Sequence, residues 1–313
     1  MSKKIGLGVI FYGNRDQLPA NKRQFSDLQK NLKSFKLKKY GFSRSESKNL
    51  IKDFKKGVIK VVLKNSYGRG HENDIEKFLE ANKIPYFGSG SAATFKGTNK
   101  SLSKNIFKKH RLPVAPGVTI DKTEWGLHKN SLIARIKKDI GFPCIIKDVA
   151  GTDSRGIIVC KSHNKLSLSV NKVFNNAQEV LVEKFIEKAV EVCCLVVGNS
   201  RPIAYPPVQM RNDGKIFTAL QKDKGSLKPK IPALLPKNII KRIQTISISA
   251  HKALGCKTFS RTDILVKNNS IFLLEVDIHP GFSSKSVTTL SAAHKGQSLD
   301  ELFLQFYKNL KKK

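Results

Sequence analysis

The chain has 313 residues, which at about 150 residues per domain is enough for two or three domains. Hydrophobic residues make up 40% and charged residues 26%, and these ordinary globular proportions exclude a chain that is disordered throughout. No window approaches the roughly 18 consecutive apolar residues of a membrane span, and the first residues lack the cleavage site of a signal peptide. We therefore expect a soluble, cytoplasmic protein with no membrane partner.

Positive charge dominates the composition, with 58 Lys and Arg against 24 Asp and Glu and a net charge of +34. Such a surface attracts polyanions. Only 11 of the 58 basic residues are arginine, which base-edge recognition favours, and the lysines are spread along the whole chain. Two interpretations stay open, a basic protein that associates with nucleic acid and a lysine-coated enzyme. The pattern favours the enzyme, with nucleic-acid binding non-specific at most.

The five cysteines do not predict a cross-linked fold. Their number is odd, none has CxxC spacing, and the adjacent Cys193 and Cys194 cannot easily bridge each other. We expect neither a disulfide framework nor a structural zinc site, which agrees with a reducing compartment.

Short apolar runs alternate with amphipathic stretches in the first part of the chain, which is typical of α/β architecture. The runs at 4–11 and 58–63 predict buried strands. Segments 26–35 and 47–54, between these runs, have apolar residues at helical spacing. Residues 74–90 predict a helix that is followed by a short strand and a flexible loop.

The same alternation continues to the end of the chain. Asn99 begins a predicted helix that Pro113 closes, and segment 142–160 predicts two strands that are joined by a polar loop. Segment 262–277 predicts a hairpin, because polar residues separate its two apolar runs. The remaining predicted elements are strands at 179–187 and 190–198 and helices at 239–254 and 299–312.

Three acidic residues near the carboxyl end give the strongest chemical signal. Glu275 and Asp277 share one face of a strand, because side chains alternate along it. If 262–266 and 271–277 pair as a hairpin, Asp263 joins them. Carboxylates that converge repel one another unless a cation neutralises them, and oxygen ligands select magnesium or manganese. The alternative is a solvated strand face with unrelated acids.

Two further segments carry weaker signals for a nucleotide. Lys147 ends an apolar run and precedes a loop with Gly151, where backbone N–H groups and an ammonium group would meet phosphate oxygens. The strand end at Glu183 offers backbone amides to an adenine edge, and the carboxylate of Glu191, later in the chain, would reach the ribose. An ordinary surface lysine and an ordinary strand end explain the same residues.

Taken in chain order, these segments resemble the ATP-grasp ligases, and among them the D-alanine–D-alanine ligase family. YGRGHENDIEKFLEANKIPYFGSG resembles that family's HGxxGEDGxxQGxLExxxIPYxGSG, and TNKSLSK resembles MDKxxSK. GFPCIIKDVAGTDSRGI is similar to GFPxIVKPxxxGSSxGV, and EVLVEKFIE to xVxVEKxI. ALGCKTFSRTDILV resembles ALGCxGxxRVDF, and LLEVDIHPGFSSKSVT resembles LLEVNTxPGMTxHSLxP. The resemblance covers about four-fifths of the chain, from Asn65 onward.

The resemblance implies an α/β fold with three domains. These would be an amino-terminal Rossmann-like substrate domain at 1–88, a central ATP-grasp subdomain at 89–187 and a carboxyl-terminal ATP-grasp subdomain with the metal site at 188–313. It also implies a homodimer that joins a carboxylate to an amine through an acyl phosphate. The substrates would be amino acids, and the dipeptide would serve peptidoglycan synthesis.

Site roles also follow from the resemblance. Arg261, with Ser154 and Tyr67, would act in catalysis. Asp263, Glu275 and Asp277 would bind two Mg²⁺ ions, with Mn²⁺ as the alternative. The residues that would contact ATP are Lys100, Lys147, Glu183, Lys184, Ile186, Glu191 and Leu274. The residues that would hold the amino acids are Asp16, Glu72, Lys222, Gly281 and Ser286.

Several positions depart from the family pattern. Only Asp16 stands where the family has a glutamate for the first substrate, Tyr67 replaces a histidine, and Asp277 replaces an asparagine. Asp223 replaces the tyrosine expected after Lys222. A ligase for another amino acid or hydroxy acid, or a catalytically weak nucleotide-binding relative, therefore remains an alternative.

Overall fold

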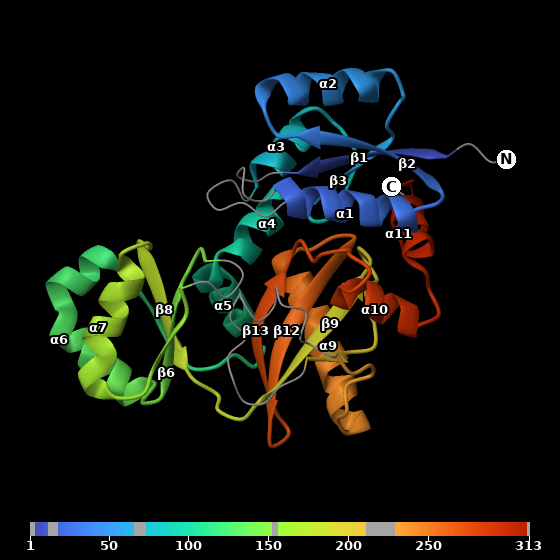
Figure 1. Ribbon diagram of the computed structural model, residues 1–313. Helices are drawn as coiled ribbons and strands as arrows, with labels where there is room; N and C mark the ends of the chain where they lie inside the picture. Colours follow the sequence, from blue (N-terminus) through green and yellow to red (C-terminus); the bar gives the residue numbers. More distant parts are fainter. Residues whose placement is uncertain (1–3, 12–17, 66–72, 152–155, 211–228, 312–313) are drawn as a thin grey trace.

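The described residues form three β-sheets with helices packed on them (Figure 1). The computed structural model describes residues 4–11, 18–65, 73–151, 156–210 and 229–311. The predicted α/β class is confirmed. Among the helices in these ranges, none combines the length and the apolar character needed to cross a bilayer. All five cysteines are buried free thiols.

The first sheet has four parallel strands in the order β2-β1-β3-β4, with helices as crossovers. This is the Rossmann-like arrangement expected for the amino-terminal segment. A Cβ on Gly6 in β1 would collide with the carbonyl oxygen of Val58, so glycine permits close backbone approach there. The elements are β1 (Ile5–Phe11), α1 (Leu18–Asn31), β2 (Phe35–Gly41), α2 (Arg44–Lys55), β3 (Val61–Lys64), α3 (Asp74–Ala81) and β4 (Tyr86–Phe87).

Strand β2 differs from the expectation of helical spacing over residues 26–35. The helix ends at Asn31 and the strand FKLKKYG begins at Phe35. Within the described residues β2 pairs only with β1, so it lies at the sheet edge. Only Phe35 and Tyr40 of this strand are buried. Three of its residues are exposed lysines, so the strand lacks a clear alternation of apolar and polar residues. The second predicted strand, at 58–63, is also shifted and occupies Val61–Lys64.

The second sheet is antiparallel, in the order β5-β8-β6-β7, and α6 and α7 pack on it through one hydrophobic cluster. The two strands predicted within 142–160 are confirmed as the antiparallel pair β6 and β7. The elements are β5 (Gly117–Asp121), α6 (Lys122–Asp139), β6 (Cys144–Asp148), β7 (Ile158–Cys160), α7 (His163–Phe174) and β8 (Glu179–Lys184).

The third sheet is also antiparallel, in the order β10-β9-β12-β13, and β11 pairs with β9. The predicted hairpin is confirmed. Asn268 and Asn269 have φ values of 47° and 64°, which a two-residue type I′ turn requires. The elements are β9 (Val190–Val197), β10 (Ile203–Ala204), β11 (Val208–Gln209), α9 (Lys237–Leu254), β12 (Phe259–Lys267) and β13 (Ser270–Asp277).

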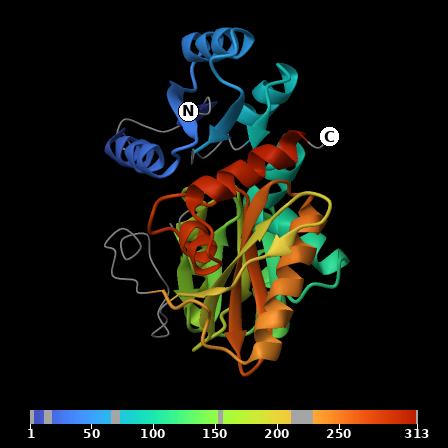
Figure 2. The same cartoon turned by 90° about the vertical axis from the view of Figure 1, so that its right-hand side faces the viewer.

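Four more helices join these sheets: α4 (Ser91–Thr98), α5 (Lys100–Lys109), α10 (Val287–His294) and α11 (Leu299–Lys311). Helix α11 lies between the first and third sheets (Figures 1 and 2). Its Phe303 packs on Phe35 and Phe87, with ring centroids 6.1 and 5.5 Å apart. Phe107 of α5 belongs to the core of the third sheet. The first and third sheets thus share a core, and the domain boundaries stay a prediction.

Candidate active site

Four charged residues face one another across the β12–β13 hairpin. Arg261 lies opposite Asp277 in the register, and Asp263 lies opposite Glu275. A β-bulge follows, because Ile264 pairs with Leu273 and so leaves Leu274 as the extra residue of β13. The predicted convergence of the three acids at one end of the hairpin is confirmed by this register.

Arg261 is the cation that neutralises two of these acids. Its Nε and Nη2 donate to the two oxygens of Asp263 at 2.7 and 2.8 Å, and its Nη1 lies 3.3 Å from Oδ2 of Asp277. Burial acts against the guanidinium charge, but the carboxylates of Asp263 and Asp277 outweigh it and raise the pKa of Arg261. Burial also raises the pKa of Asp277, which accepts a hydrogen bond from the backbone of His279 at 2.9 Å.

Lys100 connects Glu275 to the second sheet. Its Nζ lies 3.7 Å from Oε2 of Glu275 and donates to the carbonyl oxygen of Gly151. Its backbone N–H donates to the Val149 carbonyl at 3.1 Å. Asn99, whose side chain accepts from the backbone of Leu102 at 2.8 Å, caps the helix that begins at Lys100. The first turn of α5 therefore joins the end of β6 to the acids of β13.

A second group of charged side chains joins α5 to strands β6 and β8 of the second sheet. Glu183 of β8 accepts from Nζ of Lys147 at 2.6 Å with one oxygen, and from Nζ of Lys104 with the other. The three side chains are 5%, 12% and 7% exposed, in that order. Burial acts to raise the pKa of Glu183, but the two ammonium groups hold it below its usual value. One buried carboxylate thus forms ion pairs with two lysines.

The pKa values of the two lysines shift in opposite directions. Burial lowers the pKa of Lys104, and the carboxylate of Glu183 opposes that shift without reversing it. At Lys147 burial acts in the same direction, but Glu183, with smaller contributions from Glu275 and Glu191, raises the pKa. The ammonium group of Lys147 therefore interacts electrostatically with acids of both antiparallel sheets.

Lys104 was not among the predicted site residues. It lies one helical turn after Lys100 and belongs to the same TNKSLSK segment, so helical spacing places both lysines on one face of α5. That spacing was the available signal. Lys104 is buried, and its charge is satisfied by Glu183 rather than by solvent.

Four more predicted residues end β8 or follow β8 or β13 in the chain. Lys184 Nζ donates to the Phe142 carbonyl at 3.3 Å, and Ile186 follows β8 in a half-buried position. Gly281 lies in the segment after β13. Ser286 caps α10, since its Oγ accepts from the backbone of Thr289 at 3.2 Å. The predicted residues Asp16, Tyr67, Glu72, Ser154 and Lys222 lie outside the described residues, as do Asp153 and Asp223.

The acids suit a metal ion that arrives with a nucleotide. Within the described ranges, no three His, Cys, Asp or Glu side chains form a ready metal site. Mg²⁺ is usually held by one or two carboxylates together with substrate phosphates, so a complete protein cage is not required. Asp263, Glu275 and Asp277 offer the oxygen ligands that Mg²⁺ prefers, and Arg261 and Lys100 form ion pairs with these acids.

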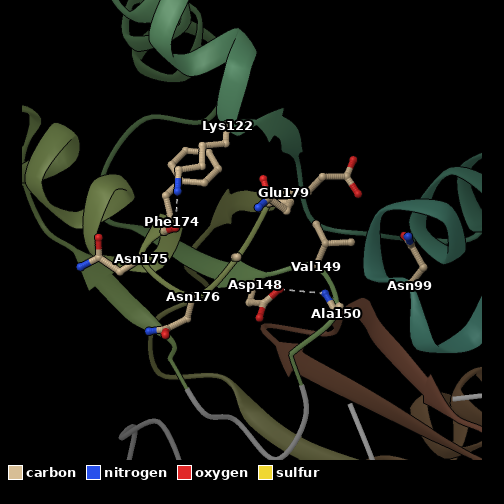
Figure 3. Close-up of a pocket in the computed structure, with 11 residues that line it drawn as sticks. Asn99, Lys122, Asp148, Val149, Ala150, Phe174, Asn175, Asn176 and Glu179 are labelled. Carbon is tan, nitrogen blue, oxygen red and sulfur yellow. Dashed lines mark hydrogen bonds between the residues drawn. The ribbon is translucent and has the colours of Figure 1, made fainter. Parts of the chain in front are cut away.

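A pocket of about 480 Å³ borders the site on the second sheet (Figure 3). Asn99, Asp148, Val149 and Ala150 line one side of it. The segment from Phe174 to Glu179 and Lys122 line the rest. Asn99 and Asp148 are the sequence neighbours of Lys100 and Lys147, but none of the predicted ATP contacts lines the pocket. It is a neighbour of the candidate site and not part of it.

Solved structures show the same fold. A D-alanine–D-alanine ligase from Bacillus anthracis, complexed with ATP, matches with a TM-score of 0.79 and 23% identity over 98% of this chain and 97% of its own. The VanG D-Ala:D-Ser ligase from Enterococcus faecalis matches with a TM-score of 0.80 and 21% identity over 98% of this chain and 100% of its own. These likenesses show that the chain has the ATP-grasp fold.

Sequence comparisons identify the family. The family model described as D-ala D-ala ligase C-terminus matches residues 106–307. A D-alanine–D-alanine ligase from Leptospira interrogans is 30% identical over 272 residues, covering 85% of this chain and 76% of that protein. Another from Pelagibacter ubique is 30% identical over 306 residues, covering 96% of each. The chain belongs to the D-alanine–D-alanine ligase family, and it is an ADP-forming ligase of the ATP-grasp fold.

Proposed function

We propose that the chain joins two D-alanine molecules into a dipeptide for peptidoglycan synthesis, with ATP converted to ADP and phosphate. The observation that carries this proposal is the contact of Lys100 with both Glu275 and the Gly151 carbonyl. It brings the acids of β13 to the loop after Lys147, where the sequence predicts the ATP phosphates. Family membership supports the reaction class.

The chemistry explains why these cations are gathered in one place. A carboxylate is a poor electrophile, and transfer of the ATP γ-phosphoryl group to one of its oxygens gives an acyl phosphate with ADP as the leaving group. The amine of the second amino acid then attacks the carbonyl carbon, phosphate departs, and the nitrogen loses a proton. Negative charge grows first on phosphoryl oxygens and then on the tetrahedral oxyanion, so cations fixed in advance stabilise both steps.

The residues of this chain take distinct parts in that sequence. Lys100 and Lys147 would hold phosphate oxygens, and Glu183 keeps Lys147 in place through the 2.6 Å contact. Arg261, whose position Asp263 fixes through two hydrogen bonds, would stabilise the oxyanion. Mg²⁺ bound by the acids of the hairpin would neutralise charge between the phosphates.

Further properties belong to the same proposal. The chain would act on small amino acids in the cytoplasm as a homodimer, and nucleic acid would bind it only non-specifically through its lysines. Lys184, Ile186, Glu191 and Leu274 would contact the nucleoside. The amino acids would be held by Asp16, Glu72, Lys222, Gly281 and Ser286, while Ser154 and Tyr67 would assist catalysis.

A ligase for a different amino acid or hydroxy acid is the second candidate. The departure at Asp16 favours it, because the family pattern has a glutamate for the first substrate at that position. The site for ATP is the same in both candidates. They differ only in the acid or amine that the protein accepts.

Phosphate release tests the proposal. The purified full chain is incubated with MgATP and a panel of D- and L-amino acids and hydroxy acids, and each product is identified by mass spectrometry. We expect release with D-alanine and the mass of the D-alanyl dipeptide. Release with another substrate alone would support the second candidate. No release with any substrate would remove the catalytic claim. The variant Glu275→Gln, which removes the charge of one of the three hairpin acids, should lower phosphate release, and Glu301→Gln, a change at an exposed acid on α11, serves as its matched control.

A further inference from the structure

A second buried cluster of charged residues lies outside the candidate active site. Nζ of Lys64 is 2.9 Å from each carboxylate oxygen of Glu76. Nε2 of His279 is 3.0 Å from Oε1 of Glu76 and 3.2 Å from Nζ of Lys64. The hydroxyl of Thr94 donates to the same Oε1 at 3.2 Å. The side chains of Lys64, Glu76 and His279 are only 5%, 1% and 13% exposed.

The members of this cluster come from opposite ends of the chain. Lys64 ends β3, Glu76 lies in the first turn of α3, and Thr94 belongs to α4. His279 comes 215 residues after Lys64 and two residues after the end of β13. The cluster therefore ties three elements of the amino-terminal part to the segment that leaves the hairpin.

Buried charges of this kind contribute more to position than to stability. Removing an ion pair from water costs free energy that its attraction only partly recovers, and apolar side chains of the same volume often serve stability as well. The hydrogen bonds that a carboxylate accepts from an ammonium group and an imidazole are directional, however, and only one arrangement of the three elements satisfies them. The cluster is thus suited to fixing where His279 lies.

His279 holds the adjoining candidate site through its backbone. Its N–H donates to Oδ1 of Asp277 at 2.9 Å, and Asp277 in turn contacts Arg261. The preceding residue, Ile278, is packed so closely against α4 that a Cβ on Gly97 would overlap its side chain. The segment from 278 onward is therefore held by the amino-terminal part before it reaches Gly281 and Ser286.

We propose that Lys64, Glu76 and His279 form a clamp between the first and third sheets that positions segment 278–286, and with it the subsite for the second amino acid. None of the three is a catalytic residue, because each acts through the segment that it holds. The clamp's effect on substrate rests on the proposed function, whereas its effect on the segment does not. Loss of the clamp should weaken amino-acid binding while ATP binding is retained.

Two variants break the clamp from opposite sides. His279→Ala keeps the Lys64–Glu76 ion pair and the backbone N–H that binds Asp277, so folding should be preserved. Glu76→Gln keeps the shape of the side chain and removes its charge. Glu80→Gln is the matched control, because Glu80 lies one turn further along α3 and binds Tyr86 and Ser91 instead.

Steady-state kinetics and amide hydrogen exchange of the full-length protein test the proposal. We expect both variants to raise the KM for the amino acid about tenfold while the KM for ATP changes less than about twofold. Exchange in peptides covering 278–286 should quicken about tenfold, with α9 unchanged. The double variant should show no more than the larger single effect, since both changes break one contact.

The outcomes separate the clamp from the proposed reaction. If His279→Ala leaves both the amino-acid KM and the exchange of 278–286 at wild-type values, the clamp is wrong. If the wild-type protein forms no product, the proposed function fails, and the exchange data alone decide the clamp. If Glu76→Gln does not fold, His279→Ala still gives the decisive result. Equal effects from Glu80→Gln would also overturn the proposal.

Discussion

Removal of the Glu183 charge should destabilise the protein far more than removal of one of its lysine partners. In Glu183→Gln, Lys104 and Lys147 become two buried ammonium groups without a carboxylate, and breaking a buried pair in this way costs about 3–5 kcal/mol. In Lys104→Met, the Lys147–Glu183 pair remains balanced, and burial already disfavours the Lys104 charge. That change should cost less than about 1 kcal/mol.

Urea unfolding measures this difference in the free energy of unfolding, and the signal can be taken from the second sheet, which contains Glu183. Trp125, the only tryptophan of the sequence, is 5% exposed in the core of the second sheet, so its fluorescence reports unfolding there. With a slope of about 2 kcal/mol per molar urea, a loss of about 4 kcal/mol lowers the midpoint by about 2 M. Equal midpoints for Glu183→Gln and the wild type, or for the two variants, would refute the reasoning.

Three further predictions concern stability and turnover. The buried ring of His251 is hydrogen-bonded to Ser260 and the Gly198 carbonyl, and burial lowers its pKa from 6.5 to about 4, so the unfolded chain binds the extra proton as the pH falls. Up to about 3 kcal/mol of the stability that is present above pH 6.5 is therefore lost by about pH 4. His251→Asn should flatten this pH dependence of stability, as measured by thermal unfolding between those pH values. Arg261→Lys cannot reproduce the two-bond contact with Asp263, so kcat should fall about 100-fold with little change in the KM for ATP, and an unchanged kcat would remove Arg261 from catalysis. Asp300→Asn weakens the bonds from the Ser34 backbone and hydroxyl at 2.9 and 2.6 Å and should lower the free energy of unfolding by about 1 kcal/mol, measured by urea titration.

The sequence predicted the carboxyl-terminal hairpin well, because apolar runs and the asparagine turn are local signals. The three acids converge on that hairpin as expected. The metal ion that the sequence indicates for these acids stays a prediction. The ion pair of Arg261 with Asp263 was not predicted, although Arg261 lies two residues before Asp263 on the same strand and therefore reaches its carboxylate.

Other features depend on contacts that local patterns do not contain. Strand β2 was not predicted, because this edge strand is rich in lysine and buries only two of its side chains in the core. The contact of His279 with Lys64 and Glu76 joins residues far apart in the sequence, so no spacing rule indicates it. Lys104 was recoverable from its position one helical turn after Lys100, but its carboxylate partner was not.

The fate of the carboxylate oxygen tests the acyl-phosphate route most directly. D-alanine labelled with ¹⁸O in its carboxylate is supplied with MgATP, and the inorganic phosphate that is released is analysed by mass spectrometry. If the carboxylate attacks the γ-phosphoryl group and the amine later expels phosphate, one labelled oxygen must leave with each phosphate. Phosphate that carries no label would show that water, and not the amino acid, receives the phosphoryl group.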